Sequence, residues 1–510
     1  MKSLKQNLLK IYLFLIIGIY PLYVGNDYYD LCDRKRNFLY GVSGVTCLVL
    51  LAVLGIDWFR KEQVGLSRQE KWRGINITEK FLVMYCGIVT ISYICSDFKY
   101  EVLWGTDGWY MGTILLLLMS VLALMTSYLY KMEEKVLYYF MISSGLVFGL
   151  GICNRFSFYP IMESFLPTFI STLGNINWFC GYMSVVAPIG VSLYVLSEKE
   201  KTIRKKILFL YCLLTFITGF CQGSFSVFLW EGIMFIILFW ISLKKITWMK
   251  NWFMTLFLWG FSGQIVRVLK YVLSDYFNYD YVKLVDTNLT LLIAVFSFIV
   301  YVILQNNEKN MLELTSDNIK EIRSWLLSGL FGGLFAYGFL SIINTTIGIP
   351  FLQGNAVFTW DVRWGTDRGV CFSTAFLIFQ KMPFLKKMIG IGADGFFAFA
   401  YTDVEIADYI NSFFSDAALS NAHNEVFTNL VNLGVLGTIA YLGIFITFFV
   451  QCMKRGEKDS MAYVFAVCVI CYFANNMVSF AQIYNTPYLF ILLGIGSAYL
   501  KKAEIYKKSC

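Results

Sequence analysis

The stretch from Gly348 to Glu425 differs from the rest of this 510-residue chain. It contains four polar segments: Asp361-Val-Arg363, Asp367-Arg368-Gly369, Ile389-Gly-Ile-Gly-Ala-Asp394-Gly395 and Asn421-Ala-His423-Asn424-Glu425. His423 is the only histidine in the protein. A connection this long among otherwise short ones is usually functional or disordered, and its aromatic residues and internal periodicity argue against disorder. We therefore interpret residues 348–424 as a domain that holds the functional site and is carried on a membrane bundle.

The composition places the chain in a membrane. Hydrophobic residues make up 58% of the sequence and charged residues 15%, with a mean hydropathy of +0.61, whereas soluble chains are about 25% charged. The net charge of +8 needs no nucleic-acid partner, because basic residues at the cytoplasmic ends of membrane helices account for it. The 13 cysteines form no CxxC pair, and no glycine-rich nucleotide loop is present. We therefore expect no metal, no disulfide framework and no cofactor.

The apolar segments predict an all-α polytopic membrane protein. We expect about fourteen transmembrane helices, and not fewer than about twelve, because each segment is close to the ~20 residues that cross a bilayer. About eleven of these helices fall in residues 1–347, and about three, with a cytoplasmic tail, fall in residues 425–510. The segments lie near residues 8–25, 38–56, 80–96, 109–130, 136–153, 176–197, 207–222, 225–243, 252–272, 286–305, 325–346, 425–451, 461–479 and 484–500.

The distribution of basic residues predicts the orientation. If the spans alternate from a cytoplasmic N-terminus, the cytoplasmic segments contain most of the 42 lysines and arginines. By the positive-inside rule, both termini are then cytoplasmic and the long loop is extracytoplasmic. Arg34-Lys35-Arg36 falls on the outer side and opposes this orientation.

Several polar residues gather at the predicted outer surface: Arg155, Asn175, Asn177, Arg267 and Lys270. Asparagine is a preferred helix cap, so capping is the alternative to ligand contact for the two asparagines. Arg267 lies within a predicted span, where a charge is a site candidate by default. The alternative for Arg267 is snorkelling toward the outer headgroups.

The long loop has internal structure. The apolar spacing predicts a helix over residues 369–382 that Pro383 ends, and a second short helix over residues 404–414. Glycines 390, 392 and 395 predict a tight turn where backbone can approach a ligand. Asn421 is expected to cap the helix that becomes the next span, which would place His423 in its first turn. There the helix dipole would favour the neutral imidazole that a general base requires. The alternative is an interfacial histidine without a task.

Four segments, in this order, resemble the O-antigen ligase and polymerase family of membrane glycosyltransferases. They are Gly174-Asn-Ile-Asn-Trp-Phe-Cys-Gly-Tyr182; Arg368-Gly-Val-Cys-Phe-Ser-Thr-Ala375 with Pro383 and the turn Ile389–Gly395; Ala422-His-Asn-Glu-Val-Phe-Thr-Asn-Leu-Val-Asn-Leu-Gly-Val-Leu-Gly437; and Tyr484–Gly494. The resemblance covers residues 174–500. One departure is present: where the family commonly shows Ser-Arg-Gly at the outer end of a middle span, this chain reads Cys221-Gln222-Gly223.

The resemblance implies a helical glycosyltransferase architecture of the GT-C type in the cytoplasmic (inner) membrane. It implies a polyprenyl-pyrophosphate-linked oligosaccharide donor, such as an undecaprenyl pyrophosphate, and metal-independent transfer with inversion to a glycan or lipid acceptor. The enzyme would polymerise or ligate a cell-surface polysaccharide of the cell envelope, in contact with membrane lipid.

The implied roles fall on residues of the four polar segments and of the outer surface. His423 would be the catalytic base and Arg368 would stabilise the pyrophosphate charge. Arg155, Arg267 or Lys270 would replace the missing arginine, unless the pyrophosphate is held differently. The expected substrate-binding residues are Arg155, Asn175, Asn177, Arg267, Lys270, Arg363, Asp394, Asn424 and Glu425.

Two alternatives stay open at this point. The first is a flippase for lipid-linked oligosaccharides or another transporter, which fits the number of spans equally well. Transporters tend to place charges and broken helices at the membrane midplane, whereas this chain gathers its polar residues at one face and in one loop. The second concerns the base, which could be a loop carboxylate: Asp394, Asp403, Glu405 or Asp408.

Overall fold

The computed structural model describes residues 2–25, 30–61, 74–161, 171–198, 202–277, 282–307, 314–355, 357–414 and 418–508. In these residues the regular structure is entirely helical, with twenty α-helices and no strand. The predicted all-α class is therefore confirmed. Parts of several predicted cytoplasmic segments, namely residues 1, 62–73, 199–201, 308–313 and 509–510, lie outside the described residues.

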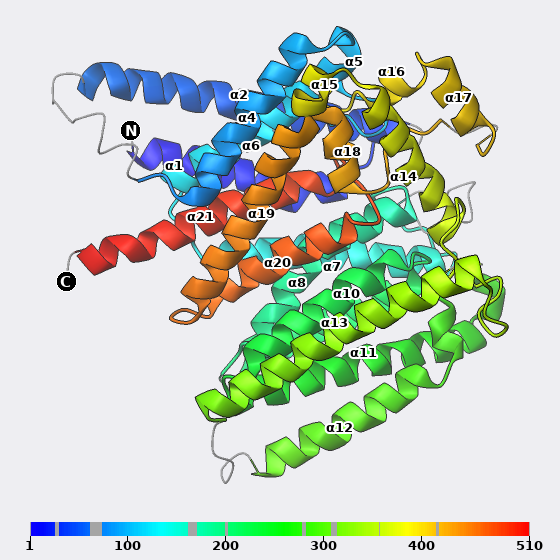
Figure 1. Ribbon diagram of the computed structural model, residues 1–510. Coiled ribbons are helices and arrows are strands. Elements are labelled where there is room, and N and C mark those ends of the chain that lie inside the picture. Colours follow the sequence, from blue (N-terminus) through cyan, green and yellow to red (C-terminus); the bar gives the residue numbers. More distant parts are fainter. Residues whose placement is uncertain are drawn as a thin grey trace.

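The N-terminal part forms a bundle of antiparallel helices (Figure 1). Its helices are α1 (Lys2–Leu13), α2 (Leu31–Lys61), α4 (Ile77–Cys95), α5 (Lys99–Trp104), α6 (Thr113–Leu129), α7 (Lys135–Arg155), α8 (Ile176–Val195), α9 (Ile203–Cys221), α10 (Ser226–Ser242), α11 (Ile246–Val272), α12 (Leu289–Asn307) and α13 (Ser316–Thr346). The long loop contains α14 (Trp364–Lys381), α15 (Phe384–Ile389), α16 (Phe396–Ala400) and α17 (Val404–Asn411). The chain then forms α18 (Glu425–Asn432), α19 (Gly434–Gly456), α20 (Met461–Asn475) and α21 (Thr486–Lys508).

The chain is a multi-pass membrane protein by helix length and hydropathy. Eight described helices are long and apolar enough to cross a membrane: Leu31–Asp57 within α2, and α4, α7, α8, α11, α12, α13 and α19. Three shorter apolar helices are α6, α10 and α20. The other three predicted spans, near residues 8–25, 207–222 and 484–500, fall on α1 with the π-helical turn after it, on α9 and on α21. The prediction of fourteen spans is thus supported for eight long helices, and the larger number stays a prediction.

Helix α8 lies at the centre of the bundle, whereas α13 lies at its edge. Of the most apolar 18-residue window in each helix, 94% is buried in α8 and 6% in α13. A helix that is apolar on all sides is buried in protein or faces lipid, and these two helices represent the two cases. Small residues let the neighbours of α8 approach closely: a Cβ on Gly181 would lie 2.6 Å from the Asn485 side chain.

Both chain ends lie at the same end of the bundle, and α5, α15, α16 and α17 lie at the opposite end (Figure 1). This arrangement agrees with the predicted orientation, in which the termini share one side and the long loop occupies the other.

The three residues of the basic cluster that opposes the predicted orientation, residues 34–36, all contact oxygen atoms within the protein. Lys35 is fully buried, and its Nζ donates to the carbonyl oxygens of Tyr20 at 2.9 Å and Pro21 at 3.3 Å. Arg34 pairs with Asp30, and Arg36 pairs with Asp33. Because both arginines are paired with carboxylates, the unpaired charge of this cluster on the predicted outer side is reduced to that of Lys35, and its weight against the predicted orientation is smaller.

The helices predicted in the long loop are present, with shifted ends. Helix α14 begins five residues before the predicted start at 369 and ends at Lys381, before Pro383, and α17 covers most of residues 404–414. These helices enclose a second apolar core of their own, which includes Cys371, Ile378, Ile391, Phe396, Ile406 and Ile410. Residues 356 and 415–417 of the loop lie outside the described residues.

The predicted continuous helix over residues 425–451 is wrong. The chain forms α18 and α19, separated at Leu433, and Gly434 has φ +67°. Val431 on α18 belongs to the core of the loop helices, whereas α19 packs against α4 and α20. A left-handed residue interrupts α-helical hydrogen bonding, so α18 can pack with the loop while α19 enters the bundle.

The orientation can be tested by placing single reactive cysteines at Glu198 and Ser412, both of which are exposed. We expect a membrane-impermeant maleimide to label Ser412→Cys in intact cells, and to label Glu198→Cys only after the membrane is permeabilised. Labelling of both positions in intact cells would contradict the predicted orientation.

Candidate functional site

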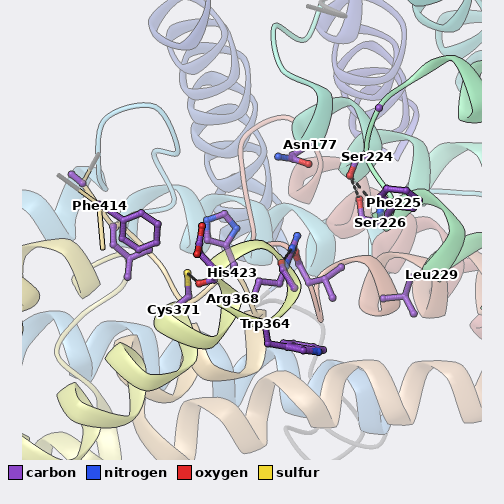
Figure 2. Close-up of a pocket in the computed structure, with 16 residues that line it drawn as sticks. Asn177, Ser224, Phe225, Ser226, Leu229, Trp364, Arg368, Cys371, Phe414 and His423 are labelled. Atoms are coloured by element: carbon purple, nitrogen blue, oxygen red, sulfur yellow. Dashed lines mark hydrogen bonds between the residues drawn. The ribbon is translucent and has the colours of Figure 1, made fainter. Parts of the chain in front are cut away.

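A cavity of about 550 Å³ opens between the loop helices and the end of the bundle that lies opposite the chain termini (Figure 1). Figure 2 shows Trp364, Arg368, Cys371, Phe414 and His423 on one side of it, and Asn177, Ser224, Phe225, Ser226 and Leu229 on the other. We call it the main cavity. It contains both residues that the resemblance assigns to catalysis, His423 and Arg368.

His423 lies in the turn before α18. Its backbone N–H donates to Asn421 Oδ1 at 2.9 Å, and its φ is +47°, a conformation that a non-glycine residue adopts only where its surroundings hold it. Its ring packs edge to face against Phe480, with 5.1 Å between the centroids. The predicted position in the first helical turn is wrong, because the N-cap of α18 is Asn424 and not Asn421.

The imidazole of His423 is neutral for a different reason from the one the sequence suggested. Burial, and next the positive charge of Arg368, lower its pKa from 6.5 to about 4. Desolvation disfavours the charged form of a histidine, and a nearby cation adds to that effect. Within the described residues, neither ring nitrogen makes a hydrogen bond, so the ring is available to a ligand in the main cavity.

Arg368 projects from a distorted first part of α14. Gly365 and Asp367 both have left-handed φ, at +64° and +63°. The guanidinium donates from Nε and Nη2 to the carbonyl oxygen of Val478, at 3.1 and 2.9 Å, and from Nη1 to the carbonyl oxygen of Gly365. These bonds use three of its five N–H groups and leave two for a ligand.

The Arg-Gly pair at Arg368 and Gly369 has a steric basis. A Cβ on Gly369 would lie 2.4 Å from the carbonyl oxygen of Asp361. Only glycine lets the backbone of residues 361–362 approach α14 this closely. Arg363, which the sequence proposed for substrate binding, is the exposed N-cap of α14 and is not among the residues that line the main cavity.

Of the three asparagines proposed for substrate binding, two cap helices and one lines the main cavity. Asn175 is the N-cap of α8 and accepts from the backbone N–H of Asn177 at 2.8 Å, as the capping alternative predicted. Asn177 itself lines the main cavity. Asn424 caps α18, and its Nδ2 donates to the carbonyl oxygen of Met477 at 3.0 Å.

The three cations proposed to replace the missing arginine lie in two different places. Arg155 is fully buried, and its Nε donates to the carbonyl oxygen of Cys221, directly before Gln222. Arg267 and Lys270 line a separate cavity of about 750 Å³ beside α11, where Lys270 pairs with Asp286. The structure therefore places Arg155 against the backbone next to Gln222, where the resemblance expects an arginine, but Arg155 is not among the residues that line the main cavity. The other two cations lie at a different cavity.

Asp394 and Glu425 also lie away from the main cavity. Both are buried, and they line a small void of about 40 Å³ together with Asn421 and Phe480. Burial raises the pKa of each carboxyl to about 7. Of the other loop carboxylates, Asp403 and Glu405 pair with Lys381, and none of Asp403, Glu405 and Asp408 is among the residues lining the main cavity.

The glycine turn of residues 389–395 packs against the break between α18 and α19. The N–H groups of Ile391 and Gly392 donate to the carbonyl oxygens of Val431 and Asn432, at 3.2 and 2.9 Å. Gly390 has φ +81°, and a Cβ there would lie 2.1 Å from the carbonyl oxygen of Asn432. The turn thus fixes the C-terminal end of α18, and none of its residues lines the main cavity.

Two contributors to the site could not be found by sequence reasoning. Phe480 and Val478 hold His423 and Arg368, but they look like part of an ordinary apolar segment near the C-terminus. Their only signal was proximity to the Tyr484–Gly494 segment. Among the described residues, no three His, Cys, Asp or Glu side chains gather in a way that could hold a metal ion.

No protein-family model and no curated protein sequence matches this chain. The helices and their hydropathy define its class as a multi-span, all-helical membrane protein.

The packing of the glycine turn gives a test of the fold. We expect Gly390→Ala to lower the free energy of unfolding by about 1–3 kcal/mol or more, because it combines a left-handed backbone with a steric clash. The matched control is Gly329→Ala on α13, where a Cβ would meet nothing within 4 Å. Removing a helical glycine should stabilise the control by up to about 1 kcal/mol. Thermal unfolding of the two purified variants measures the difference, and equal melting temperatures would contradict the described packing.

Proposed function

We propose that this protein transfers or polymerises oligosaccharides from a polyprenyl-pyrophosphate donor at the outer face of the cytoplasmic membrane. The observation that carries the proposal is the meeting of His423 and Arg368, from separate parts of the chain, in one cavity at the end of the bundle opposite the termini. A neutral imidazole beside a guanidinium with unused N–H groups suits a transfer that needs one base and one anion-stabilising group.

In the proposed reaction, an acceptor hydroxyl attacks the anomeric carbon on the face opposite the pyrophosphate. The new carbon–oxygen bond forms as the bond to the pyrophosphate oxygen breaks, which inverts the anomeric configuration. His423 takes the hydroxyl proton, and the bonding electron pair leaves with the pyrophosphate. Arg368 stabilises that charge, because its planar N–H groups match phosphate oxygens.

The donor itself would adjust the basicity of His423. An imidazole with a pKa of about 4 is a weak base at neutral pH. A pyrophosphate bound near Arg368 would offset the cation that lowers this pKa, and nearby negative charge favours imidazolium. Donor binding would therefore raise the pKa of His423 toward the working pH.

The apolar side of the main cavity suggests where the lipid lies. Phe225, the N-cap of α10, and Leu229 within α10 line the cavity, and both are exposed, at 66% and 38%. Trp364 lies across from them on α14. A polyprenyl chain leaving the bilayer along this side would place its pyrophosphate next to Arg368.

The polymerase and ligase forms of the activity differ in acceptor, and both use the same donor chemistry. A flippase or other transporter remains the alternative of another class. The side on which lipid-linked intermediates accumulate in a deletion strain separates the two classes, since a transporter defect retains them inside and a transferase defect leaves them outside.

Substitution of the two proposed catalytic residues is the direct test. We expect His423→Ala to slow product formation from purified lipid-linked donor by roughly 10²–10⁴-fold, the usual contribution of a general base. Arg368→Ala should cost about 1.5–3 kcal/mol, or roughly 10- to 150-fold. Arg267→Ala is the control, because it removes the same side chain at the separate cavity, and it should change the rate less than about threefold. Near-normal product from well-folded His423→Ala would assign the base to another group.

The pH dependence gives a second test. His423 accepts a proton only when neutral, so activity is lost as pH falls through its pKa. The acid limb of kcat/KM reports the free protein and should lie near pH 4. The acid limb of kcat reports the donor complex and should lie at higher pH, because the bound pyrophosphate favours imidazolium. Identical acid limbs in the two profiles would contradict the proposed coupling.

A further inference from the structure

The connection between α20 and α21 contacts both proposed catalytic side chains. We call residues 476–481 the buttress segment. The carbonyl oxygen of Val478 accepts two hydrogen bonds from Arg368, at 2.9 and 3.1 Å, and the ring of Phe480 packs against His423. The distance between the base and the cation therefore depends on where this one segment lies.

The buttress segment is held mainly by the first residues of α18. The backbone N–H of Glu425 donates to the carbonyl oxygen of Asn476 at 2.8 Å, and Glu425 Oε2 accepts from the backbone N–H of Ala481. Asn424 Nδ2 donates to Met477 between these two points. Glu425 thus binds both ends of the segment, once through its backbone and once through its carboxyl group.

Asp394 supports the Phe480 ring through the connection between α5 and α6. Its Oδ2 accepts from the backbone N–H groups of Thr106 at 2.7 Å and Met111 at 3.3 Å, and so fixes the connection between α5 and α6. Trp109, within that connection, packs edge to face on Phe480 at 4.8 Å and donates from Nε1 to Ser420 Oγ at 2.6 Å. Phe480 is therefore held by two groups: by Trp109, in the connection that Asp394 fixes, and by the buttress segment, which Glu425 fixes.

Glu425 is 5% exposed and does not line the main cavity. Asn429 Nδ2 donates to its Oε1 at 3.2 Å. Glu425 lines one small void with Asp394 and Tyr85, and a second small void with Tyr441 of α19 and Tyr472 of α20. No lysine or arginine is among the described residues that line these voids. Burying a carboxyl group in such surroundings costs free energy unless the group is hydrogen-bonded, so the hydrogen bonds of Glu425 are the feature to explain.

We infer that Glu425 is a positioning residue, which sets the separation and orientation of His423 and Arg368 by fixing the buttress segment, and which neither binds substrate nor transfers a proton. The inference deepens the proposed function, because it gives the pair of catalytic groups a common support. What matters in this role is an acceptor atom at the position of Oε2, and a neutral amide oxygen can supply that acceptor.

The single histidine allows a test that does not depend on activity. In the purified full-length protein with isotope-labelled histidine and a histidine-free tag, nuclear magnetic resonance reports the pKa of His423 alone. We expect the pKa of His423 to be about 4 in the wild type. In Glu425→Ala the Phe480 ring is released and the imidazole becomes hydrated, so its pKa should rise toward 6.5. In Glu425→Gln the acceptor remains, and the pKa should stay within about half a unit of the wild type.

Transfer assays on the same variants give the second readout. Glu425→Ala should lower kcat by about a hundredfold with donor KM changed less than about threefold, because a displacement of about 1 Å can cost that much. Glu425→Gln should retain at least about one third of the wild-type rate. Phe480→Leu reaches the same contact without disturbing the buried carboxyl, so it should raise the histidine pKa even if Glu425→Ala fails to fold. Glu101→Ala, an exposed carboxylate on α5, is the matched control and should change neither readout.

The outcomes separate the two proposals. An unchanged histidine pKa in both Glu425→Ala and Phe480→Leu would overturn the positioning role. Loss of activity in Glu425→Gln equal to that in Glu425→Ala would also overturn it and would assign the effect to the charge or proton of Glu425. If the pKa of His423 shifts as expected in these variants but the protein shows no transfer activity, the positioning role is supported and the proposed function is overturned.

Discussion

The hydrogen bonds from Arg368 and Glu425 to the connection between α20 and α21 are the constraint on which the site depends. Backbone groups that are buried away from water must be paired, because unsatisfied ones cost several kcal/mol. Here their partners come from α14 in the long loop and from α18, which directly follows the loop. The same bonds that satisfy the backbone of the connection therefore join the loop to the bundle and place His423 beside Arg368.

This arrangement explains why the loop is not a separate appendage. Its helices have their own apolar core, yet α18 shares that core while its first residues bind the C-terminal connection. The break at Gly434 lets α18 and α19 take different directions. The site consequently lies at the junction of the loop and the bundle.

The burial of several polar residues changes the role that the sequence suggested for them. Lys35, Arg155, Asp394 and Glu425 are all buried, and each is hydrogen-bonded to main-chain groups of another segment. In the sequence they read as surface charges or as ligands for a substrate. In the structure they connect segments that are distant in the chain, which is how a largely apolar protein can specify one packing among many.

The sequence by itself determined the class and the positions of most helices, because both depend on local properties: apolar runs of bilayer length and helix signals such as Pro383. Arg368 and His423 stand out in isolated polar segments of the sequence, and the catalytic roles proposed for them rest mainly on the resemblance of those segments to a known family. Capping by Asn175 was one of two roles that the sequence left open, because the same residue type serves both.

Only the tertiary structure decided which polar residues share a cavity. It separated Arg267 and Lys270 from the main cavity and brought Arg155 to Cys221. It also placed the N-cap of α18 at Asn424, which leaves His423 before the helix, and it assigned Phe480 and Val478 to the site. The physical reason is that side chains distant in sequence meet only through packing and backbone hydrogen bonds between segments. No periodicity or motif within one segment records those contacts.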